Sequence, residues 1–596
     1  MTVIDIETQP YNPSLKVQPN AYALEPYRDE FYVSMVGIHG NNHSVVYEHG
    51  SDTFVEDVTS VLKELDGQVV FCHNALFDIS GLIRLVGWGI VKRIKWKDSI
   101  LLSKWVSNSQ LTKSDSHTLA ACVERHLPGN TDFLEMKDNQ EDDKKYWLDR
   151  ALSDCKVTFE LVNKLFDILP KEQREGFNME CRTLKHLARG YMQGISIDTE
   201  TVEDARVMYS AGISAGLRGL NTEMSIVRSP AKLGNLIFEE WGLPHYSETA
   251  SGKKCTAAGD LKHIAESTRD PRIASLLEVK SKMTVMSKYI NGFSKTVEYV
   301  GDNTMHPVPR LFNSYTGRMS YTSKMKKKFQ VGIALHQLPR KHKDIKKAMV
   351  APKGYKFFYC DFAAQELRLM AHFSGDKVMI DAFNNGRDLH ATMTETITGA
   401  PYDAIVQGVL EGDPSIIDDR NNGKLTNLSS MYRIGAKSLK AKFFEQYDKV
   451  ISIQEARYFI ESYKRTFIGI PRYWDEAIGT AARKGYAETV SGRRYYINKM
   501  DWEGESSAIN MPIQGSGMDI AEVVITEVCE AYPDNIFQLA VHDSLTWLIP
   551  EDADHEELAR FVNSVDFDKA FGKTFSLRFP LDCAVGINLA DMENIV

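Results

Sequence analysis

The chain has 596 residues, of which 43% are hydrophobic and 25% are charged, and its net charge is −9 at neutral pH. This length predicts several domains, and the composition is typical of a globular protein. The sequence contains no apolar run of eighteen residues, its start "MTVIDIETQP" is unlike a signal peptide, and its eight cysteines form no paired zinc motif, so we expect a cytoplasmic protein without a membrane span.

The first 165 residues alternate short apolar runs with helical patterns, which predicts an α/β layer fold. "TVIDIET" and "GQVVFCHN" are expected strands, and "SDTFVEDVTSVLKELDG" is an amphipathic helix between them. Asp5 and Glu7 share one strand face, because side chains alternate along a strand. "HNALFD" adds Asp78 and "DCKVT" adds Asp154, and four such carboxylates can hold two metal ions for phosphodiester hydrolysis.

From about residue 175 to 300 the pattern is mostly helical, and Ser229 and Pro230 are a candidate N-cap and first helical residue. A strand is expected at "GYKFFYCD", followed by helices from about 376 to 483. "NIFQLAVHDSLTWLIP" then predicts a β-hairpin, because two apolar strands are interrupted by a short polar turn that contains Asp543.

Between Arg318 and Lys356 the chain has twelve Lys or Arg residues and one acid, Asp344. Such a local basic segment on an acidic chain fits a nucleic-acid backbone, although a solvated basic loop is the simpler alternative.

Two aspartates close apolar strands, Asp361 after "KFFYC" and Asp543 in the hairpin turn. Aspartate commonly closes turns, so each position alone is weak evidence. If the two strands are neighbours, the carboxylates repel unless divalent cations lie between them. Mg²⁺ prefers carboxylate oxygens and also binds substrate phosphates, so the pair predicts two-metal phosphoryl transfer.

The segment "RNNGKLTNLSSMY" places four side chains at intervals of four residues along one helical stripe: Arg420, Lys424, Leu428 and Tyr432. Two cations followed by an apolar and an aromatic side chain match the order of phosphates and base in a nucleoside triphosphate. The alternative is an amphipathic helix with a snorkelling basic end.

With these segments in view, the sequence resembles a family A DNA polymerase, the class of bacterial DNA polymerase I, with a proofreading domain and without the 5′ nuclease. "DFAAQELR", "RNNGKLTNLSSMY" and "VHDS" resemble the first palm motif, the fingers helix and the last palm motif. Five further motifs lie between these in family order: "YTGRMS", "LHQLP", "DLH", "SGRRYY" and "INMPIQGSGMDI".

The resemblance implies an α/β multidomain architecture, in which a ribonuclease-H-like α/β exonuclease domain (1–170) precedes a right-hand polymerase domain (171–596). The helical thumb would cover about 200–300 and the helical fingers about 385–505. The palm, an antiparallel sheet, would cover about 301–384 and 506–596.

The resemblance also implies roles for individual residues. Asp361 and Asp543 would hold two Mg²⁺ ions, replaceable by Mn²⁺, with the backbone carbonyl of Phe362 as a further ligand. The incoming nucleotide would be bound by Arg420, Lys424, Leu428, Tyr432 and His390, and Lys424 would also donate a proton to the departing pyrophosphate. Glu366 would exclude a ribose 2′-OH. The DNA would be contacted by Arg318, Asn510, Gln514 and His542. Asp5, Glu7, Asp78 and Asp154 would hold two ions in the 3′–5′ exonuclease.

Several positions depart from the family pattern. Leu428 stands where the family usually has an aromatic residue, and Arg433 stands where it usually has glycine. Ala364 and Gln365 replace a polar–apolar pair, and Ser544 replaces a carboxylate. In the exonuclease, Arg150 stands where the family has the tyrosine that orients the attacking water. We expect an active exonuclease in which Tyr146 or Asp149 assists instead.

We therefore expect a monomeric, phage-encoded DNA polymerase of the host cytoplasm that uses dNTPs and primer–template DNA and proofreads. A processivity factor, a helicase or a single-strand-binding protein are expected partners. The alternatives are a single-subunit RNA polymerase, which Glu366 opposes, and a non-catalytic DNA-binding relative, which the retained catalytic residues oppose.

Overall fold

The computed structural model describes residues 1–8, 25–40, 42–108, 116–130, 133–134, 144–249, 252–322, 324–326, 329–330, 333–338 and 342–595. The chain divides into two compact units, each built from separate stretches of sequence. The first comprises Met1–Ile197, Thr296–Leu369 and Glu476–Val596, and the second comprises Asp198–Lys295 and Met370–Asp475. Within the described ranges, no helix has both the length and the apolar character that crossing a membrane requires.

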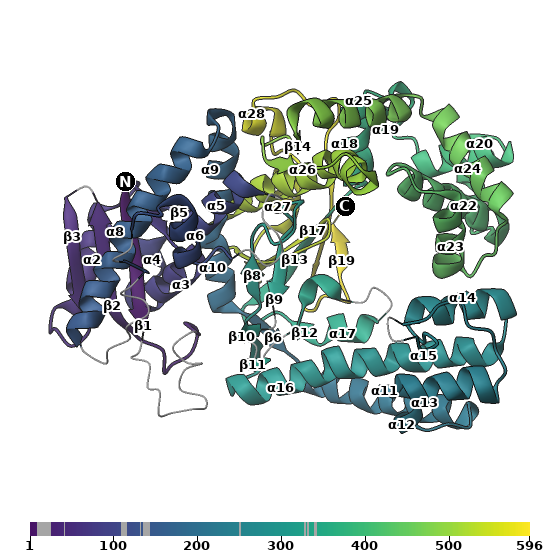
Figure 1. Ribbon diagram of the computed structural model, residues 1–596, viewed down its shortest axis with the longest axis horizontal. Coiled ribbons are helices and arrows are strands. Elements are labelled where there is room, and N and C mark those ends of the chain that lie inside the picture. The colour runs from purple at the N-terminus through teal and green to yellow at the C-terminus, as the bar shows by residue number, and fades with distance from the viewer. Residues whose placement is uncertain are drawn as a thin grey trace. The chain divides into compact units, whose positions relative to one another are not determined.

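The N-terminal part of unit 1 is a five-stranded sheet in the order β3-β2-β1-β4-β5 (Figure 1). Its strands are β1 (Thr2–Thr8), β2 (Val33–Gly40), β3 (His43–Glu48), β4 (Val69–Cys72) and β5 (Lys95–Asp98). β1 pairs antiparallel with β2 and parallel with β4. The predicted strands and the helix between them are confirmed, but the sequence interpretation missed the β2–β3 hairpin.

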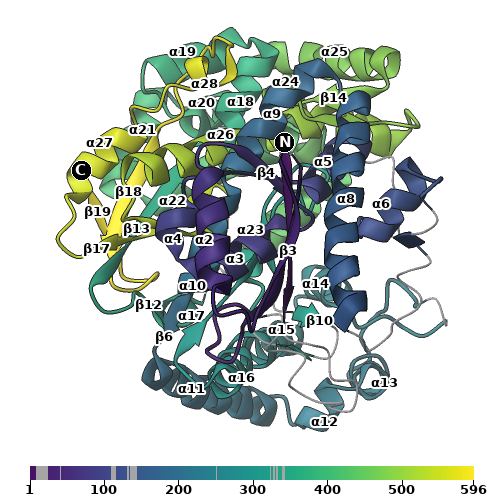
Figure 2. The same cartoon turned by 90° about the vertical axis from the view of Figure 1, so that its left-hand side faces the viewer.

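Helices cover both faces of this sheet. Figure 2 shows α2 and α3 along one face and α8 along the other. The helices of this part are α2 (Phe54–Glu64), α3 (Ala75–Val86), α4 (Trp88–Val91), α5 (Ser99–Ser107), α6 (Leu119–His126), α8 (Lys144–Ile168), η1 (Lys171–Gln173), α9 (Arg174–Arg182) and α10 (Leu184–Gln193).

A second five-stranded sheet of unit 1 is entirely antiparallel and has the order β16-β17-β13-β18-β19. Its strands are β13 (Tyr355–Phe362), β16 (Ile536–Val541), β17 (Ser544–Pro550), β18 (Leu581–Gly586) and β19 (Glu593–Ile595). Phe357, Phe358 and Trp547 are fully buried, and the rings of Phe358 and Trp547 lie 6.1 Å apart. The aromatic run of β13 is thus core, and the predicted hairpin is confirmed.

The longest helix of unit 1 is α26 (Trp502–Ala531), whose N-terminus is capped by the Asp501 side chain. Most of its side chains are buried, as expected of a helix that is apolar around its circumference. Shorter elements complete the unit: β6 (Ile195–Ile197), β7 (Thr304–Met305), β8 (Val308–Arg310), β9 (Ser320–Thr322), β10 (Lys324–Lys326), β11 (Phe329–Gln330), η4 (Leu335–Gln337), α17 (Lys343–Lys347), β12 (Met349–Val350), β14 (Tyr486–Glu488), β15 (Arg494–Tyr496), α27 (His555–Val562) and α28 (Phe567–Phe571). The basic segment from Arg318 to Lys356 falls partly outside the described residues.

Unit 2 is helical. Its first stretch contains α11 (Thr199–Gly219), α12 (Met224–Val227), α13 (Pro230–Gly234), η2 (Asn235–Glu240), α14 (Ala258–Thr268), α15 (Pro271–Val285) and η3 (Met286–Ile290). Its second stretch contains α19 (Lys377–Asn384), α20 (Leu389–Thr398), α21 (Tyr402–Glu411), α22 (Pro414–Ser430), α23 (Ala436–Tyr447) and α24 (Ile453–Thr466). Three helices run across unit boundaries: α16 (Asn291–Val300), α18 (Gln365–Ser374) and α25 (Gly469–Lys484). The predicted cap is confirmed, because the Ser229 hydroxyl accepts from the Lys232 amide.

Candidate active sites

One end of the antiparallel sheet holds the two aspartates that close apolar strands. Asp361 lies in β13 directly opposite Ser544, the first residue of β17. Asp543 occupies the β16–β17 turn, and its carbonyl oxygen accepts a hydrogen bond of 3.1 Å from the Phe362 amide. Asp361 and Asp543 are therefore backbone neighbours at one end of adjacent strands in one sheet, so the condition that the sequence left open, that their strands are neighbours, is met.

The turn that carries Asp543 is tight and strained. His542 is exposed and has a φ of 60°, a left-handed conformation that costs energy for a residue with a side chain. Ser544 donates its hydroxyl to the Val541 carbonyl at 2.8 Å, so the serine that replaces the family carboxylate helps to close this turn.

A third aspartate lies beside this pair, and the sequence interpretation missed it. Asp582 on β18 is directly opposite Asp361, on the side away from β17. The next facing pair, Cys360 and Cys583, has its sulfur atoms 3.3 Å apart, which shows how closely this register brings side chains together. Like charges that face each other destabilise a sheet, so a cation would relieve the Asp361–Asp582 pair. The available signal was an acid inside the apolar stretch "FPLDCAVG".

Glu366 and Arg318, for which the sequence suggested separate roles, form an ion pair. Glu366 lies in the first turn of α18, and its Oε1 is 2.6 Å from Arg318 Nη2. Both side chains are about one-third exposed, at 33% and 40%. A pair with this exposure contributes about 1 kcal/mol or less, so either partner can exchange for a ligand at small cost.

Asn510 and Gln514 lie one turn apart on α26, and both are half-buried. The Asn510 Oδ1 atom is buried and has no hydrogen-bond partner among the described residues. Buried polar atoms are normally paired, so this amide oxygen suits a donor from a ligand. Gln365, one of the residues that depart from the family pattern, has a hydrogen-bond partner within the protein: its side-chain amide donates to the Gly517 carbonyl of α26 at 3.0 Å.

In unit 2, helix α22 carries the predicted stripe of cations and apolar residues. Lys424 and Leu428 are both exposed, and Leu428 is 41% exposed despite its apolar character. The helix ends at Ser430, so Tyr432 lies beyond its last turn and not on the continuing stripe that the sequence suggested. The chain bends there because Arg433 adopts a φ of 58°, a conformation that glycine, the usual family residue, takes without strain.

Arg420 on α22 is held by Asp388 at the start of α20. Its Nε and Nη2 atoms both lie 2.6 Å from one carboxylate oxygen of Asp388. His390, two residues further on, accepts a hydrogen bond at Nδ1 from the Asn427 amide at 3.2 Å, which leaves Nε2 as the donor. Burial lowers the pKa of His390 to about 4, so the imidazole is neutral at pH 7.

Gly423 allows this close packing of α20 against α22. A Cβ atom at this position would lie 2.3 Å from Thr394 Oγ1 and 2.6 Å from the His390 carbonyl oxygen. The absence of a side chain at Gly423 therefore sets how near His390 lies to the cations of α22.

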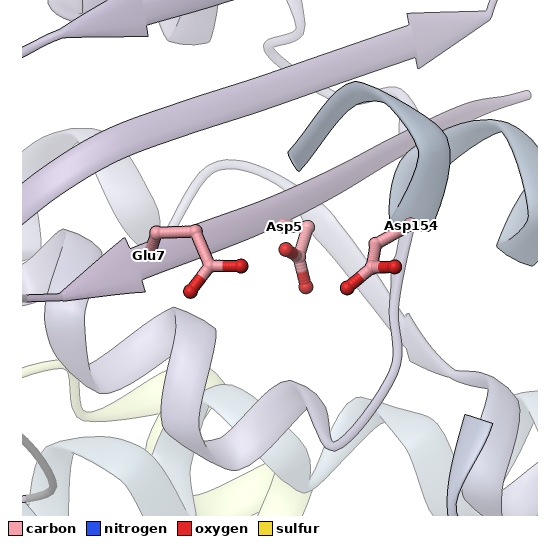
Figure 3. A group of neighbouring side chains, drawn as sticks. All are labelled: Asp5, Glu7 and Asp154. Atoms are coloured by element: carbon pink, nitrogen blue, oxygen red, sulfur yellow. The ribbon is translucent and has the colours of Figure 1, made fainter. Parts of the chain in front are cut away.

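In the N-terminal part of unit 1, Asp5 and Glu7 from β1 and Asp154 from α8 direct their carboxylates into one space (Figure 3). One oxygen from each lies within 4.8 Å of the others. Helix α8 approaches so closely because β2 has a glycine there: a Cβ at Gly37 would lie 2.8 Å from the Ala151 carbonyl oxygen. Asp78 is buried, and its Oδ1 accepts from the Ile6 amide at 3.1 Å.

Burial raises the pKa of Asp5 and of Asp78 well above their usual values, and neighbouring carboxylates raise the pKa of Asp5 further. Burial, together with Asp154, raises the pKa of Glu7 to about 7, while Arg150 opposes the shift. These carboxylates are hard oxygen donors close to one another, so their chemistry fits divalent cations such as Mg²⁺ or Mn²⁺.

Comparison with known proteins gives a consistent result. DNA polymerase family A matches residues 213–592, which is more than half of the chain. DNA polymerase I of Lactococcus lactis subsp. lactis is 27% identical over 437 residues, covering 69% of this chain and 46% of the relative. The thermostable DNA polymerase I of Thermus aquaticus is 26% identical over 371 residues, covering 61% of this chain and 41% of the relative. The chain thus spans less than half the length of these relatives.

Among solved structures, the POL domain of Pol1 from M. smegmatis, in complex with DNA primer-template and dNTP, has the same fold with a TM-score of 0.77. The two are 21% identical, and the likeness covers 99% of this chain and 96% of the other. The likeness in fold extends over nearly the whole chain, and the sequence match spans both aspartates of the antiparallel sheet. The chain belongs to DNA polymerase family A.

Proposed function

We propose that this protein is a template-directed DNA polymerase that extends a primer 3′-OH with dNTPs. The observation that carries the proposal is that Asp361 and Asp543 are backbone neighbours at one end of the antiparallel sheet, in a chain of family A. In this assignment the sheet is the palm, the helices of 200–300 are the thumb, and those within 385–505 are the fingers.

Asp361 and Asp543 would bind two Mg²⁺ ions, with the Phe362 carbonyl as a further ligand, and Asp582 adds negative charge beside them. Bound there, the ions would neutralise phosphate charge and promote attack of the primer oxygen on the α-phosphate. The carboxylate and carbonyl oxygens at these strand ends are the ligands that Mg²⁺ prefers, whereas apolar side chains could not bind it.

The fingers residues would bind the triphosphate. Arg420 exchanges Asp388 for phosphate oxygens, Lys424 contacts the phosphates from the next turn of α22, and the Nε2–H of neutral His390 donates a hydrogen bond. Lys424 then protonates the pyrophosphate that leaves. Leu428 offers an exposed apolar surface to the nucleoside, and Tyr432 acts from the turn beyond the helix.

Selection of deoxyribonucleotides and of correct base pairs would depend on residues near the aspartate end of the palm sheet. Glu366 excludes a ribose 2′-OH, and release of Arg318 from Glu366 frees a donor for the minor groove. Asn510 and Gln514 contact the same groove, where each correct base pair offers equivalent acceptors. His542, exposed in its turn, contacts the primer end.

The test is single-turnover primer extension with Asp361→Asn, and the control is Asp534→Asn, which changes an exposed aspartate two residues before β16. We expect the first variant to lose at least about 1,000-fold in rate, because one metal ligand is lost, while primer–template affinity changes little. The control should extend normally. Extension by Asp361→Asn at the control rate would refute the assignment. Parallel reactions with NTPs separate this function from that of an RNA polymerase, which Glu366 disfavours.

We further propose that the N-terminal domain is a ribonuclease-H-like 3′–5′ exonuclease that proofreads. The supporting observation is the convergence of Asp5, Glu7 and Asp154, with Asp78 buried beside them. Incubating the chain with Mg²⁺ and a single-stranded oligonucleotide should release 5′-mononucleotides, and Asp5→Asn should abolish this release. An intact 3′ end with the unaltered chain would refute this activity. The phage origin, monomeric state, cytoplasmic location and accessory partners stay predictions.

A further inference from the structure

Helix α8 brings a cation as well as a carboxylate to the N-terminal acidic site. Arg150 lies one turn before Asp154, and its Nη2 is 3.7 Å from Asp154 Oδ2. The two side chains are only 19% and 13% exposed. One turn further back, the Tyr146 hydroxyl accepts a hydrogen bond from Arg150 Nη1 at 3.4 Å. Tyr146, Arg150 and Asp154 thus follow one face of α8 at intervals of four residues.

The largely buried position of the Arg150 guanidinium is energetically unfavourable unless an anion compensates its charge. Removing a charged group from water is unfavourable, and arginine cannot relieve the cost by losing its proton. Asp154 and Glu7 compensate the charge of this guanidinium. Divalent ions held by Asp5, Glu7 and Asp154 would compete with Arg150 for these carboxylates, and the guanidinium would keep its charge.

Substrate restores an anionic partner in the same place. A strand whose 3′ end is cleaved must bring its scissile phosphate to the carboxylates of Asp5, Glu7 and Asp154, which would hold the ions, and Arg150 lies within ion-pair distance of Asp154. A guanidinium binds phosphate oxygens through paired N–H groups, and Tyr146 can hold the planar group in orientation.

We propose that Arg150 contacts a nonbridging oxygen of the scissile phosphate and stabilises the charge that builds up there during hydrolysis, with Tyr146 as its positioning residue. The inference rests on the proposed exonuclease function. A water oxygen bonds to phosphorus, the bond to the 3′ oxygen of the preceding nucleotide breaks, that oxygen gains a proton, and the water loses one to solvent. Arg150 transfers no proton. This role differs from that of a neutral hydroxyl, which can orient water but carries no charge.

The test measures single-turnover cleavage of a single-stranded oligonucleotide by the full chain, with Arg150→Ala, Arg150→Lys and a control, Arg93→Ala. Arg93 also pairs with an aspartate, Asp66, but both side chains are more than half exposed at the surface. We expect Arg150→Ala to lose about 100-fold in cleavage rate, as when one donor to a transition-state oxyanion is removed. Affinity for the oligonucleotide in Ca²⁺ should change less than about threefold, because Arg150 acts mainly in the transition state.

Further measurements separate this role from a structural one. Guanidinium ion added to Arg150→Ala should restore part of the cleavage rate. The cleavage rate of Arg150→Lys should lie between those of the unaltered chain and Arg150→Ala. Mn²⁺ should bind Arg150→Ala more tightly by calorimetry, because a competing cation is gone. Primer extension by the same preparations reports that the variants are folded.

Cleavage by Arg150→Ala within about threefold of the unaltered rate would overturn the inference, since loss of a transition-state contact must lower the rate. So would a slow variant that guanidinium does not rescue at any concentration. If the unaltered chain cleaves and Asp5→Asn does not, either result refutes only the proposed role of Arg150, and the exonuclease proposal stands. If the unaltered chain does not cleave, the exonuclease proposal itself fails.

Discussion

Replacing Gly423 by alanine tests how α20 and α22 build the candidate triphosphate site. The new Cβ would lie 2.3 Å from Thr394 Oγ1 and 2.6 Å from the His390 carbonyl oxygen. The second contact is backbone, and the Thr394 hydroxyl already donates to the His390 carbonyl at 2.8 Å. Neither contact can be relieved by moving a flexible side-chain end, so the two helices must separate by about 1 Å to reach van der Waals distance.

The expected magnitude follows from two opposing effects. Alanine in a helix interior is favoured over glycine by about 1 kcal/mol, whereas overpacking costs about 1–3 kcal/mol. The net change in the free energy of unfolding is therefore between neutral and a loss of about 2 kcal/mol. The effect on function should be larger, because displacing a binding group by about 1 Å can cost up to about 100-fold in rate.

The assay is single-nucleotide incorporation at varied dNTP concentration, with thermal unfolding of the same protein. We expect kcat/KM for dNTP to fall about 10–100-fold while primer–template affinity is unchanged. The matched control is Gly479→Ala on α25, where a Cβ would meet only Arg483 Nη1 at 3.7 Å, an ordinary contact. If Gly423→Ala behaved like Gly479→Ala in both assays, the packing argument would be wrong.

Three other predictions concern separate parts of the chain. Arg493→Met should lower the free energy of unfolding by about 3–5 kcal/mol, because it leaves Asp519 and Glu522 buried without their cation; an unchanged denaturant midpoint would count against this. Since folding raises the pKa of Glu7 from 4.5 to about 7, its contribution to stability is full below pH 4.5, and about 3 kcal/mol should be lost as pH rises to 7. Mg²⁺ should offset this loss in thermal melts. A melting temperature that changes with neither pH nor Mg²⁺ would contradict this expectation. Glu366→Ala should raise ribonucleotide incorporation relative to dNTP at least about tenfold, the effect of about 1.4 kcal/mol of selectivity, and an unchanged ratio in competition assays would exclude a gate at this residue.

Local sequence patterns predicted the elements that carry most of the candidate residues. Two apolar runs around His542 and Asp543 determine the β16–β17 hairpin, because a short polar turn between strands has few other conformations. Spacing of four residues likewise placed Lys424 and Leu428 on one exposed helix face. The helix end was not predictable in the same way, since the left-handed conformation of Arg433 has no glycine to indicate it.

Contacts between distant segments were beyond local patterns. The ion pair of Arg318 with Glu366 and the register that sets Asp582 opposite Asp361 depend on pairings between segments far apart in the chain. Strand register is fixed by the hydrophobic faces of the whole sheet, and no single strand contains this information. The close approach of α8 to β2 at Gly37 depends in the same way on two distant segments.

A crystal structure of the chain with primer–template, an incoming dNTP and Mn²⁺, with the ions located by anomalous scattering, would test directly whether Asp361 and Asp543 bind the catalytic metals. We expect Mn²⁺ peaks about 2.0–2.3 Å from the carboxylate oxygens of both Asp361 and Asp543, as is usual for oxygen-bound divalent cations of this size. Peaks bound elsewhere, with neither aspartate as a ligand while the nucleotide is in place, would contradict it.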